Sequence, residues 1–329
     1  MHEIFDLPIM SEIWKQTEGV WGLNIPPKPL FHYTSSVMTV KSILTVNELW
    51  LSKYTVMNDY SEIQYGVSLI ENEMEEKGEK DDRFNKLKES FHKFVKEEIT
   101  DYFIISFSQN GNSRLLWDSY ALKNGYCLEF TPQFISDLVF NAPLKRLVFK
   151  DGKFVEELTS KRKIYIKEIP HSLKGHGYGY EVLANNVLYD AKKQKALLDE
   201  YMQYFSQKMD SNNNIDVNIA INALVQTIPF LKDPTLKDEE EYRLVVHISP
   251  MKNERDGKKG YLRNIQYYRE SGNNLFPYIK LQMETSEYIK SVALGYMNSN
   301  SLAVETMEEF LATLPQNIEM KKCEYPLRW

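Results

Sequence analysis

The sequence predicts an α+β protein built as a single domain over residues 1–329. Short β-branched and aromatic runs, such as DYFIISFS at 101–108 and EYRLVVHI at 241–248, have the composition and length of strands. Apolar residues with helical spacing are densest between 181 and 230. Strands and helices are intermixed without regular strand–helix alternation, and no internal repeat or long flexible linker divides the chain. We therefore expect a mixed central sheet with flanking helices and a helical insertion or subdomain at 181–230.

The first hundred residues contain both types of element. Residues 7–20 have the apolar spacing of a short helix, and FHY at 31–33 reads as a strand. Thr34, Ser35 or Ser36 can then cap a helix, because a hydroxyl oxygen accepts a hydrogen bond from an unpaired amide of the first turn. ELWLSKY at 48–54 alternates as a strand does, and residues 59–100 are helical in pattern with a charged, solvated middle at 71–82.

The remaining chain adds further strands to the sheet. Ser113 can cap a short helix between the strands at 101–108 and 125–130. We expect the sheet to continue in RLVFK (146–150), KIYIKEI (163–169), YIKL (278–281) and YIKSVALGY (288–296), and the chain to close with a helix at 302–314 and a strand at 317–323.

Composition narrows the functional classes. The 40 basic and 46 acidic side chains give a formal net charge of −6, which provides no overall attraction to nucleic acid or anionic membranes. No stretch approaches the roughly 20 apolar residues of a membrane helix, and the N-terminus does not resemble a signal peptide. Cys127 and Cys323 are far apart in the sequence and form no metal-type pair. We therefore expect a cytoplasmic protein with free thiols and no membrane partner; the sequence does not define its oligomeric state.

Common catalytic signatures are absent from the sequence. It has no Walker loop, no GxSxG, no HExxH and no CxxC. The glycine-rich loop HSLKGHGYGY at 171–180 lacks the spacing of a dinucleotide fingerprint and is interpreted as a connection. His171 and His176 lie in that loop without a third ligand nearby, so we predict no metal site.

Four stretches place polar and aromatic residues at the ends of predicted strands, where binding sites tend to collect. They are LFHYTSS (30–36), LWLSKYTVMNDYSE (49–62), ISFSQNGNSRLLWDSYALKNGYCLEF (105–130) and DEEEYRLVV (238–246). In this order they resemble the motifs of a large bacterial family labelled a domain of unknown function. Leu294-Gly295 and the terminal Pro326-Leu327-Arg328 extend the resemblance over nearly the whole chain. Tyr60 departs from the family, which usually has proline there.

A second resemblance is to ADP-ribosyltransferases, in particular DNA-modifying toxins of the DarT type. The strand with His32 and Thr34, the helix after it and the later strand starting at Glu241 are similar to the superfamily's opening strand and its glutamate strand. The resemblance implies a split central sheet and NAD as the substrate. It also implies a nucleic-acid or protein target and a role as a toxin or an antiphage effector. The spacing to Glu241 is longer than in DarT, and only Lys53 stands near the place of the DarT arginine.

The resemblance assigns roles to residues of this chain. His32 would hydrogen-bond a ribose of NAD, and Glu241 would be the catalytic carboxylate. The candidate contacts to NAD are Tyr33, Thr34, Tyr54, Asn58, Asp59, Trp117, Tyr120 and Arg243. The chemistry suits these residue types, because a carboxylate stabilises the oxocarbenium-like ribose and an aromatic ring holds the flat nicotinamide.

Three other interpretations stay open. Glu241 and Arg243 can be a structural ion pair at the end of a strand, and His32 a buried histidine bonded to the backbone. The domain can be a ligand-binding or sensor module without turnover. It can also be a metal-dependent nuclease or hydrolase served by Asp59, Asp118 and Glu241.

Overall fold

The structure is a computed structural model. It describes residues 26–56, 61–98, 102–141, 145–150, 153–158, 164–167, 178–210, 214–250, 265–271, 273–283, 286–298 and 300–323. The helix expected at 7–20 lies outside these residues.

The described helices form mainly where the sequence predicts them. The α-helices are α3 (Val37–Lys41), α4 (Ser61–Gly78), α5 (Arg83–Glu98), α6 (Arg114–Ser119), α7 (Gln133–Asn141), α8 (Ala191–Asp210), α9 (Asn214–Thr227) and α11 (Ser301–Ala312). Short π or 3-10 segments are η1 (Ser42–Val46), η2 (Tyr54–Val56), η4 (Ile228–Phe230) and η5 (Pro234–Glu239). Ser36 and Ser113 cap α3 and α6 as expected, each accepting from an amide of the first turn.

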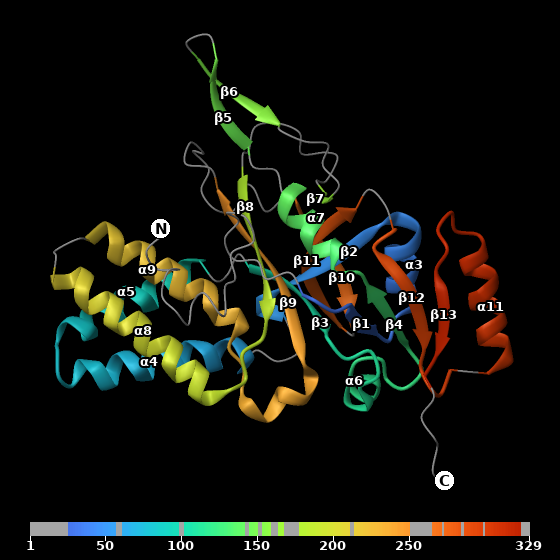
Figure 1. Cartoon of the computed structure of the whole chain (residues 1–329), viewed down its shortest axis with the longest axis horizontal. Helices are drawn as coiled ribbons and strands as arrows, with labels where there is room; N and C mark the ends of the chain where they lie inside the picture. Colours follow the sequence, from blue (N-terminus) through green and yellow to red (C-terminus); the bar gives the residue numbers. More distant parts are fainter. Residues whose placement is uncertain are drawn as a thin grey trace.

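Eleven strands form one mixed sheet, and the prediction of an α+β fold is confirmed. The strands of this sheet are β1 (Leu30–Thr34), β2 (Glu48–Lys53), β3 (Tyr102–Ser108), β4 (Tyr126–Phe130), β7 (Ile164–Ile166), β8 (Tyr178–Asn186), β9 (Glu241–Pro250), β10 (Gln266–Ser271), β11 (Asn274–Met283), β12 (Ile289–Leu294) and β13 (Glu319–Lys322). The strand pairs are antiparallel except for β12 with β13. Figure 1 shows the sheet twisting across the molecule.

The sheet divides at its central strand, β3. One edge of β3 pairs with β9 along its whole length, from Tyr102 opposite His247 to Ser108 opposite Glu241. The other edge pairs with two different strands: β2 at Phe103 and Ile104, and β1 at Ser108. From β3, β1 leads to β4 and β12, whereas β2 leads to β11 and β10. We call this division, centred on Ser106, the fork.

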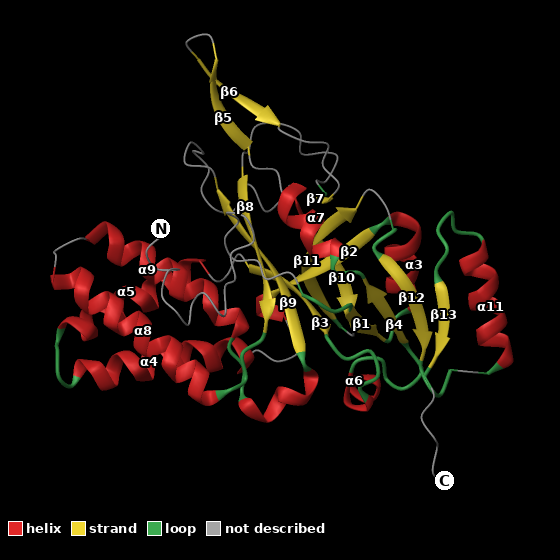
Figure 2. Cartoon of the chain, in the orientation of Figure 1, coloured by secondary structure: helices red, strands yellow, loops and turns green. Residues whose placement is uncertain are grey.

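Helices cover both faces of the central strands. On one face, Phe103, Ile105 and Phe107 of β3 pack into a core that also receives apolar side chains of α3, α7 and α11. On the other face, Tyr102 and Ile104 contribute to a second core with α4, α5, α8 and α9. Burial on both faces explains why β3 reads as a nearly continuous apolar run. Figure 2 shows these four helices gathered at one side of the sheet.

The structure corrects two expectations about the second half of the chain. The helical block begins at Ala191 and not at 181, because Tyr178–Asn186 form β8 and pair with β9. The run at 146–150 does not continue the sheet: β5 (Lys145–Lys150) pairs with β6 (Lys153–Leu158) in a separate hairpin, which projects from the sheet in Figure 1. Among the described residues, no helix has the length and apolarity required to cross a membrane.

Candidate active site at the fork

A cavity of about 540 Å³ opens at the fork. Its walls come from β1, β2, β3, β9, β10 and the α3–η1 segment, so it joins parts of the chain that are distant in sequence. The volume lies within the roughly 300–1,000 Å³ typical of small-molecule sites. The lining is rich in hydroxyl side chains, namely Thr34, Ser35, Ser36, Thr39, Ser42, Ser52 and Ser106.

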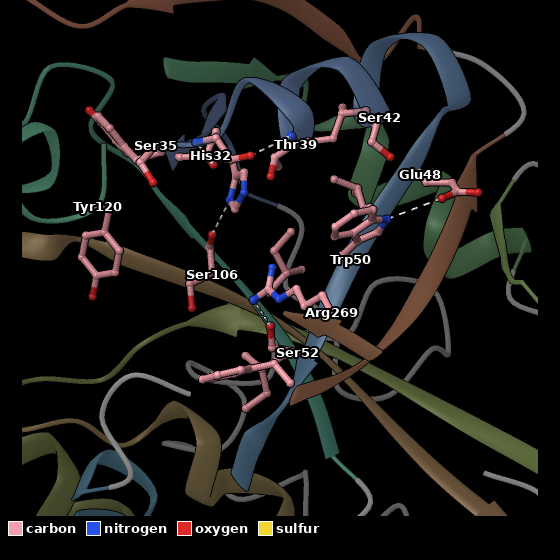
Figure 3. A pocket seen from close by; sticks show the side chains of 18 of the residues that line it. His32, Ser35, Thr39, Ser42, Glu48, Trp50, Ser52, Ser106, Tyr120 and Arg269 are labelled. Atoms are coloured by element: carbon pink, nitrogen blue, oxygen red, sulfur yellow. Dashed lines mark hydrogen bonds between the residues drawn. The ribbon is translucent and has the colours of Figure 1, made fainter. Parts of the chain in front are cut away.

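His32 stands at the fork and hydrogen-bonds the backbone of β3. Its Nδ1 lies 3.0 Å from the carbonyl oxygen of Ser106, as Figure 3 shows. Because the partner is a carbonyl, Nδ1 carries the proton and donates, and Nε2 is left as an acceptor. Burial lowers the pKa of His32 below its usual 6.5, with a further contribution from the Arg269 charge and an opposing one from the bond to Ser106. The imidazole is therefore neutral at pH 7.

Glu241 begins β9 on the other side of β3 and is held by two cations. Its Oε1 lies 2.8 Å from Nε of Arg243, and its Oε2 lies 2.9 Å from Nη2 of Arg243 and 3.0 Å from Nζ of Lys232. All three side chains are buried, with 1% of Lys232 and of Arg243 exposed. Burial alone would raise the pKa of Glu241, but the two cations and the Ser106 hydroxyl together lower it to about 2. The carboxylate is charged throughout the physiological range.

The strand register explains this arrangement. Ser106 pairs with Arg243, and Ser108 pairs with Glu241, so these four side chains share one face of the sheet. Arg243 is fixed further by donating from Nη1 to the Pro229 carbonyl oxygen at 2.7 Å. Ser106 lies beside Glu241 and contributes to the lowering of its pKa. A carboxylate offers about four lone-pair positions, and the three contacts from Arg243 and Lys232 occupy three of them.

Trp50 and Tyr120 supply aromatic surface to the cavity. Trp50 packs at a tilt on Tyr278 of β11, with ring centroids 4.8 Å apart, and Lys280 lies 5.8 Å from its ring centre. Tyr120 follows α6 and is 41% exposed. Figure 3 shows Trp50 and Tyr120 on opposite sides of His32.

The predicted site residues fall into three groups. His32, Glu241, Tyr33, Thr34, Tyr120 and Arg243 all line the cavity. Tyr54 and Trp117 do not: Tyr54 is buried in the helical core, and Trp117 is fully buried beneath Tyr33, with ring centroids 5.2 Å apart. Asn58 and Asp59 lie outside the described residues.

Tyr33 lines the cavity and also has a structural role. Its hydroxyl donates to the Asn110 carbonyl oxygen at 2.7 Å and accepts from the Ser113 amide at 3.1 Å. These bonds fix the loop between β3 and α6, which leads to Tyr120.

Sequence patterns do not single out several of the cavity residues. Trp50 lies in the motif-like stretch 49–62, but the alternation of β2 indicates only a strand residue at this position. Ser52 and Ser106 read as ordinary polar strand positions. Lys232 and Arg269 had no signal at all, because one precedes the η5 turn and the other lies in the polar strand β10.

The metal-site interpretation requires clustered carboxylates. Asp118 lies on α6 and accepts from the Tyr296 hydroxyl, and it does not line the cavity with Glu241. Within the part of the chain that the structure describes, no group of three or more His, Cys, Asp or Glu side chains is placed to hold a metal ion. Asp59, His171 and His176 lie outside that part.

Comparisons with family models, with curated proteins and with solved structures find no significant match for this chain.

Proposed function

We propose that the cavity binds NAD and that the protein transfers ADP-ribose from it to a nucleic-acid or protein target. The observation that carries this proposal is the placement of His32 and Glu241, which are distant in sequence, in the lining of one cavity with Trp50 and Tyr120. The division of the sheet at β3 agrees with the split sheet that the ADP-ribosyltransferase resemblance implies.

The reaction would break the bond between the nicotinamide nitrogen and ribose C1′. The bonding electron pair leaves with nicotinamide, which becomes neutral, and positive charge develops on the ribose. A nucleophilic oxygen or nitrogen of the target, or water, then forms a bond to C1′ and loses its proton. A charged carboxylate close to the ribose stabilises this oxocarbenium-like state more than the ground state.

The groups that line the cavity fit the ribose and the nicotinamide of such a substrate. Neutral His32 offers Nε2 as an acceptor for a ribose hydroxyl. The indole of Trp50 or the ring of Tyr120 gives nicotinamide a flat apolar surface. The serine and threonine hydroxyls of the lining can donate to or accept from the sugar.

Glu241 would act mainly through its charge. Because Arg243 and Lys232 already occupy three of its lone-pair positions, a ribose hydroxyl has about one position left to bond, and Ser106 lies beside the carboxylate. The two cations also offset part of its field. We therefore expect slow release of nicotinamide without a target, and a role for Ser106 in the position of the ribose.

The test is nicotinamide release from NAD by purified protein, with and without DNA, RNA and protein targets. Wild type is compared with Glu241→Gln and His32→Ala, and with Glu305→Gln as a matched control on the exposed face of α11. We expect release by wild type and the control, and loss of at least tenfold in both site variants that still fold by circular dichroism. Release that continues unchanged in both site variants would contradict the proposal.

The two buried cations on Glu241 support a second candidate, a nucleotide sensor without turnover. A glutamate held by three contacts from Arg243 and Lys232 is suited to structure as well as to catalysis. This candidate predicts that NAD binds in the cavity and remains intact in the presence of every target. Binding with release separates the transferase from the sensor.

A further inference from the structure

Arg269 of β10 reaches into the cavity at the fork. It lies opposite Phe276 of β11, and its Nη2 donates to the Ser52 hydroxyl of β2 at 2.9 Å. In Figure 3 its guanidinium lies in the space between His32 and Ser52. The side chain thus crosses from the outer strand of the sheet to the edge where β1 and β2 separate.

The charge of Arg269 is not neutralised by any residue within the described part of the chain. No carboxylate forms an ion pair with it among the residues that the structure describes. Its Nε is buried and has no hydrogen-bond partner among the same residues. Buried donors without partners are rare in folded proteins, because each loses its bonds to water without replacement.

The carboxylates that line the cavity do not fill this role. Glu48 is held by Lys167 and by Lys280, whose Nζ lies 3.0 Å from Oε2. Glu241 is held by Arg243 and Lys232. Glu270 is exposed at the edge of the cavity, and no ion pair joins it to Arg269 among the described residues.

The neighbours of Arg269 favour a negatively charged ligand. Ser52 accepts from the guanidinium, so its own hydroxyl hydrogen can be donated to a ligand. Burial lowers the pKa of His32, and the nearby charge of Arg269 lowers it further, so no second cation competes with Arg269 for an anion. A guanidinium forms paired, charge-assisted bonds with phosphate oxygens.

We propose that Arg269 and Ser52 form an anion subsite that binds a phosphate group, and that the ligand of the fork is therefore a phosphorylated nucleotide and not a free nucleoside. The inference rests on the proposed function only for the choice of NAD, whose pyrophosphate would be the group bound. The subsite places this anion beside His32, next to the ribose of the same ligand.

Calorimetric titrations with phosphorylated and phosphate-free ligands test the subsite. The ligands are inorganic pyrophosphate, ADP-ribose and nicotinamide riboside, and the proteins are wild type, Arg269→Gln and Arg269→Lys. Arg114→Gln is the matched control, since Arg114 is 62% exposed on α6 and does not line the cavity. We expect Arg269→Gln to weaken ADP-ribose binding at least tenfold and Arg269→Lys to weaken it less. Nicotinamide riboside should bind equally well to wild type and Arg269→Gln.

A thermal melt gives a second readout. Because Arg269 is a half-buried charge with no counter-ion among the described residues, Arg269→Gln should melt at or above the wild-type temperature in the absence of ligand. Pyrophosphate or ADP-ribose should raise the melting temperature of wild type more than that of the variant. A variant that melts well below wild type would show a structural role instead.

The outcomes separate the subsite from the proposed function. Unchanged ADP-ribose affinity in Arg269→Gln, or an equal loss for nicotinamide riboside, would overturn the subsite even if NAD is cleaved. Arg269-dependent binding of pyrophosphate and ADP-ribose, with no binding or cleavage of NAD, would support the subsite and overturn the NAD proposal.

Discussion

Replacing Glu241 by glutamine tests how the site is held together. The substitution keeps the shape of the side chain but removes the negative charge that pairs with Arg243 and Lys232, each only 1% exposed. Lys232 keeps Glu239 as a second partner, so Arg243 is the charge left without compensation. Removing one partner of a buried ion pair typically costs about 3–5 kcal/mol, because the remaining charge is left buried without compensation.

Proton linkage gives an independent estimate of the same effect. Cations beside the buried Glu241 lower its pKa from 4.5 to about 2 in the folded chain. A tenfold change in a dissociation constant corresponds to about 1.4 kcal/mol, so the ionised carboxylate stabilises the fold by about 3 kcal/mol. Because the folded pKa is the lower one, this stabilisation is complete above the unfolded pKa and is lost as the pH falls towards 2.

The assay is urea unfolding followed by circular dichroism, with wild type, Glu241→Gln and the exposed control Glu305→Gln measured side by side. At pH 7 we expect Glu241→Gln to lower the free energy of unfolding by about 3 kcal/mol and the control to change it by less than about 0.5 kcal/mol. Between pH 7 and pH 3.5 the difference between wild type and Glu241→Gln should narrow by about 1.4 kcal/mol, as protonation of the unfolded wild-type chain begins.

Two results would refute this account of Glu241. One is a Glu241→Gln variant as stable as wild type at pH 7. The other is a deficit that does not change with pH, because a change of packing alone binds no protons. Either result would mean that Arg243 and Lys232 do not depend on this carboxylate.

Three further predictions concern Lys232, His32 and Gly125, which lie in or beside the site. Lys232→Met should lower the free energy of unfolding in urea at pH 7 by about 1–3 kcal/mol. This loss should be smaller than that of Glu241→Gln, because Arg243 still pairs with Glu241. A larger loss would make Lys232 the principal partner of Glu241. The imidazole of His32 should titrate below pH 6.5 in NMR spectra of the folded protein. The free energy of unfolding should fall as the pH drops below 6.5, because the unfolded chain then binds a proton that the folded chain excludes. A titration at or above pH 6.5 would disprove the burial of His32. Gly125→Ala should cost about 1–3 kcal/mol in urea unfolding, because an added Cβ would collide with the backbone oxygen of Thr34 beside the cavity; unchanged stability would show that β1 can shift there.

Local sequence patterns predicted the elements that border the site. Ser36 and Ser113 cap their helices, and the apolar run of β3 forms a strand buried on both faces. These features depend on neighbouring residues, and their physical causes act over a few positions. They could therefore be read from the chain before its fold was known.

Pairings between distant segments could not be read in this way. β8 has glycine, glutamate and asparagine in its sequence and becomes a strand by pairing with β9. Arg269 acquires its position only because β10 joins β11, which joins β2. The contact of Lys232 with Glu241 depends on the η5 turn that brings the two together. Each of these is set by the sheet as a whole and leaves no local signal.

The aromatic residues of the predicted site also show what local sequence cannot predict. Trp117 and Trp50 lie in similar motif-like stretches, yet Trp117 is fully buried beneath Tyr33 and Trp50 lines the cavity. Composition marks both as large apolar residues. Only the direction in which each side chain leaves its helix or strand separates a core residue from one that can contact a ligand.

The most direct test of the central claim is a calorimetric titration of NAD into the wild-type protein and into His32→Ala, with Glu305→Gln as the control. The account predicts one NAD bound per chain at sub-millimolar concentration by wild type and the control, and at least tenfold weaker binding by a folded His32→Ala variant. No binding to wild type at millimolar NAD, or equal binding by His32→Ala, would contradict the claim that the fork is an NAD site.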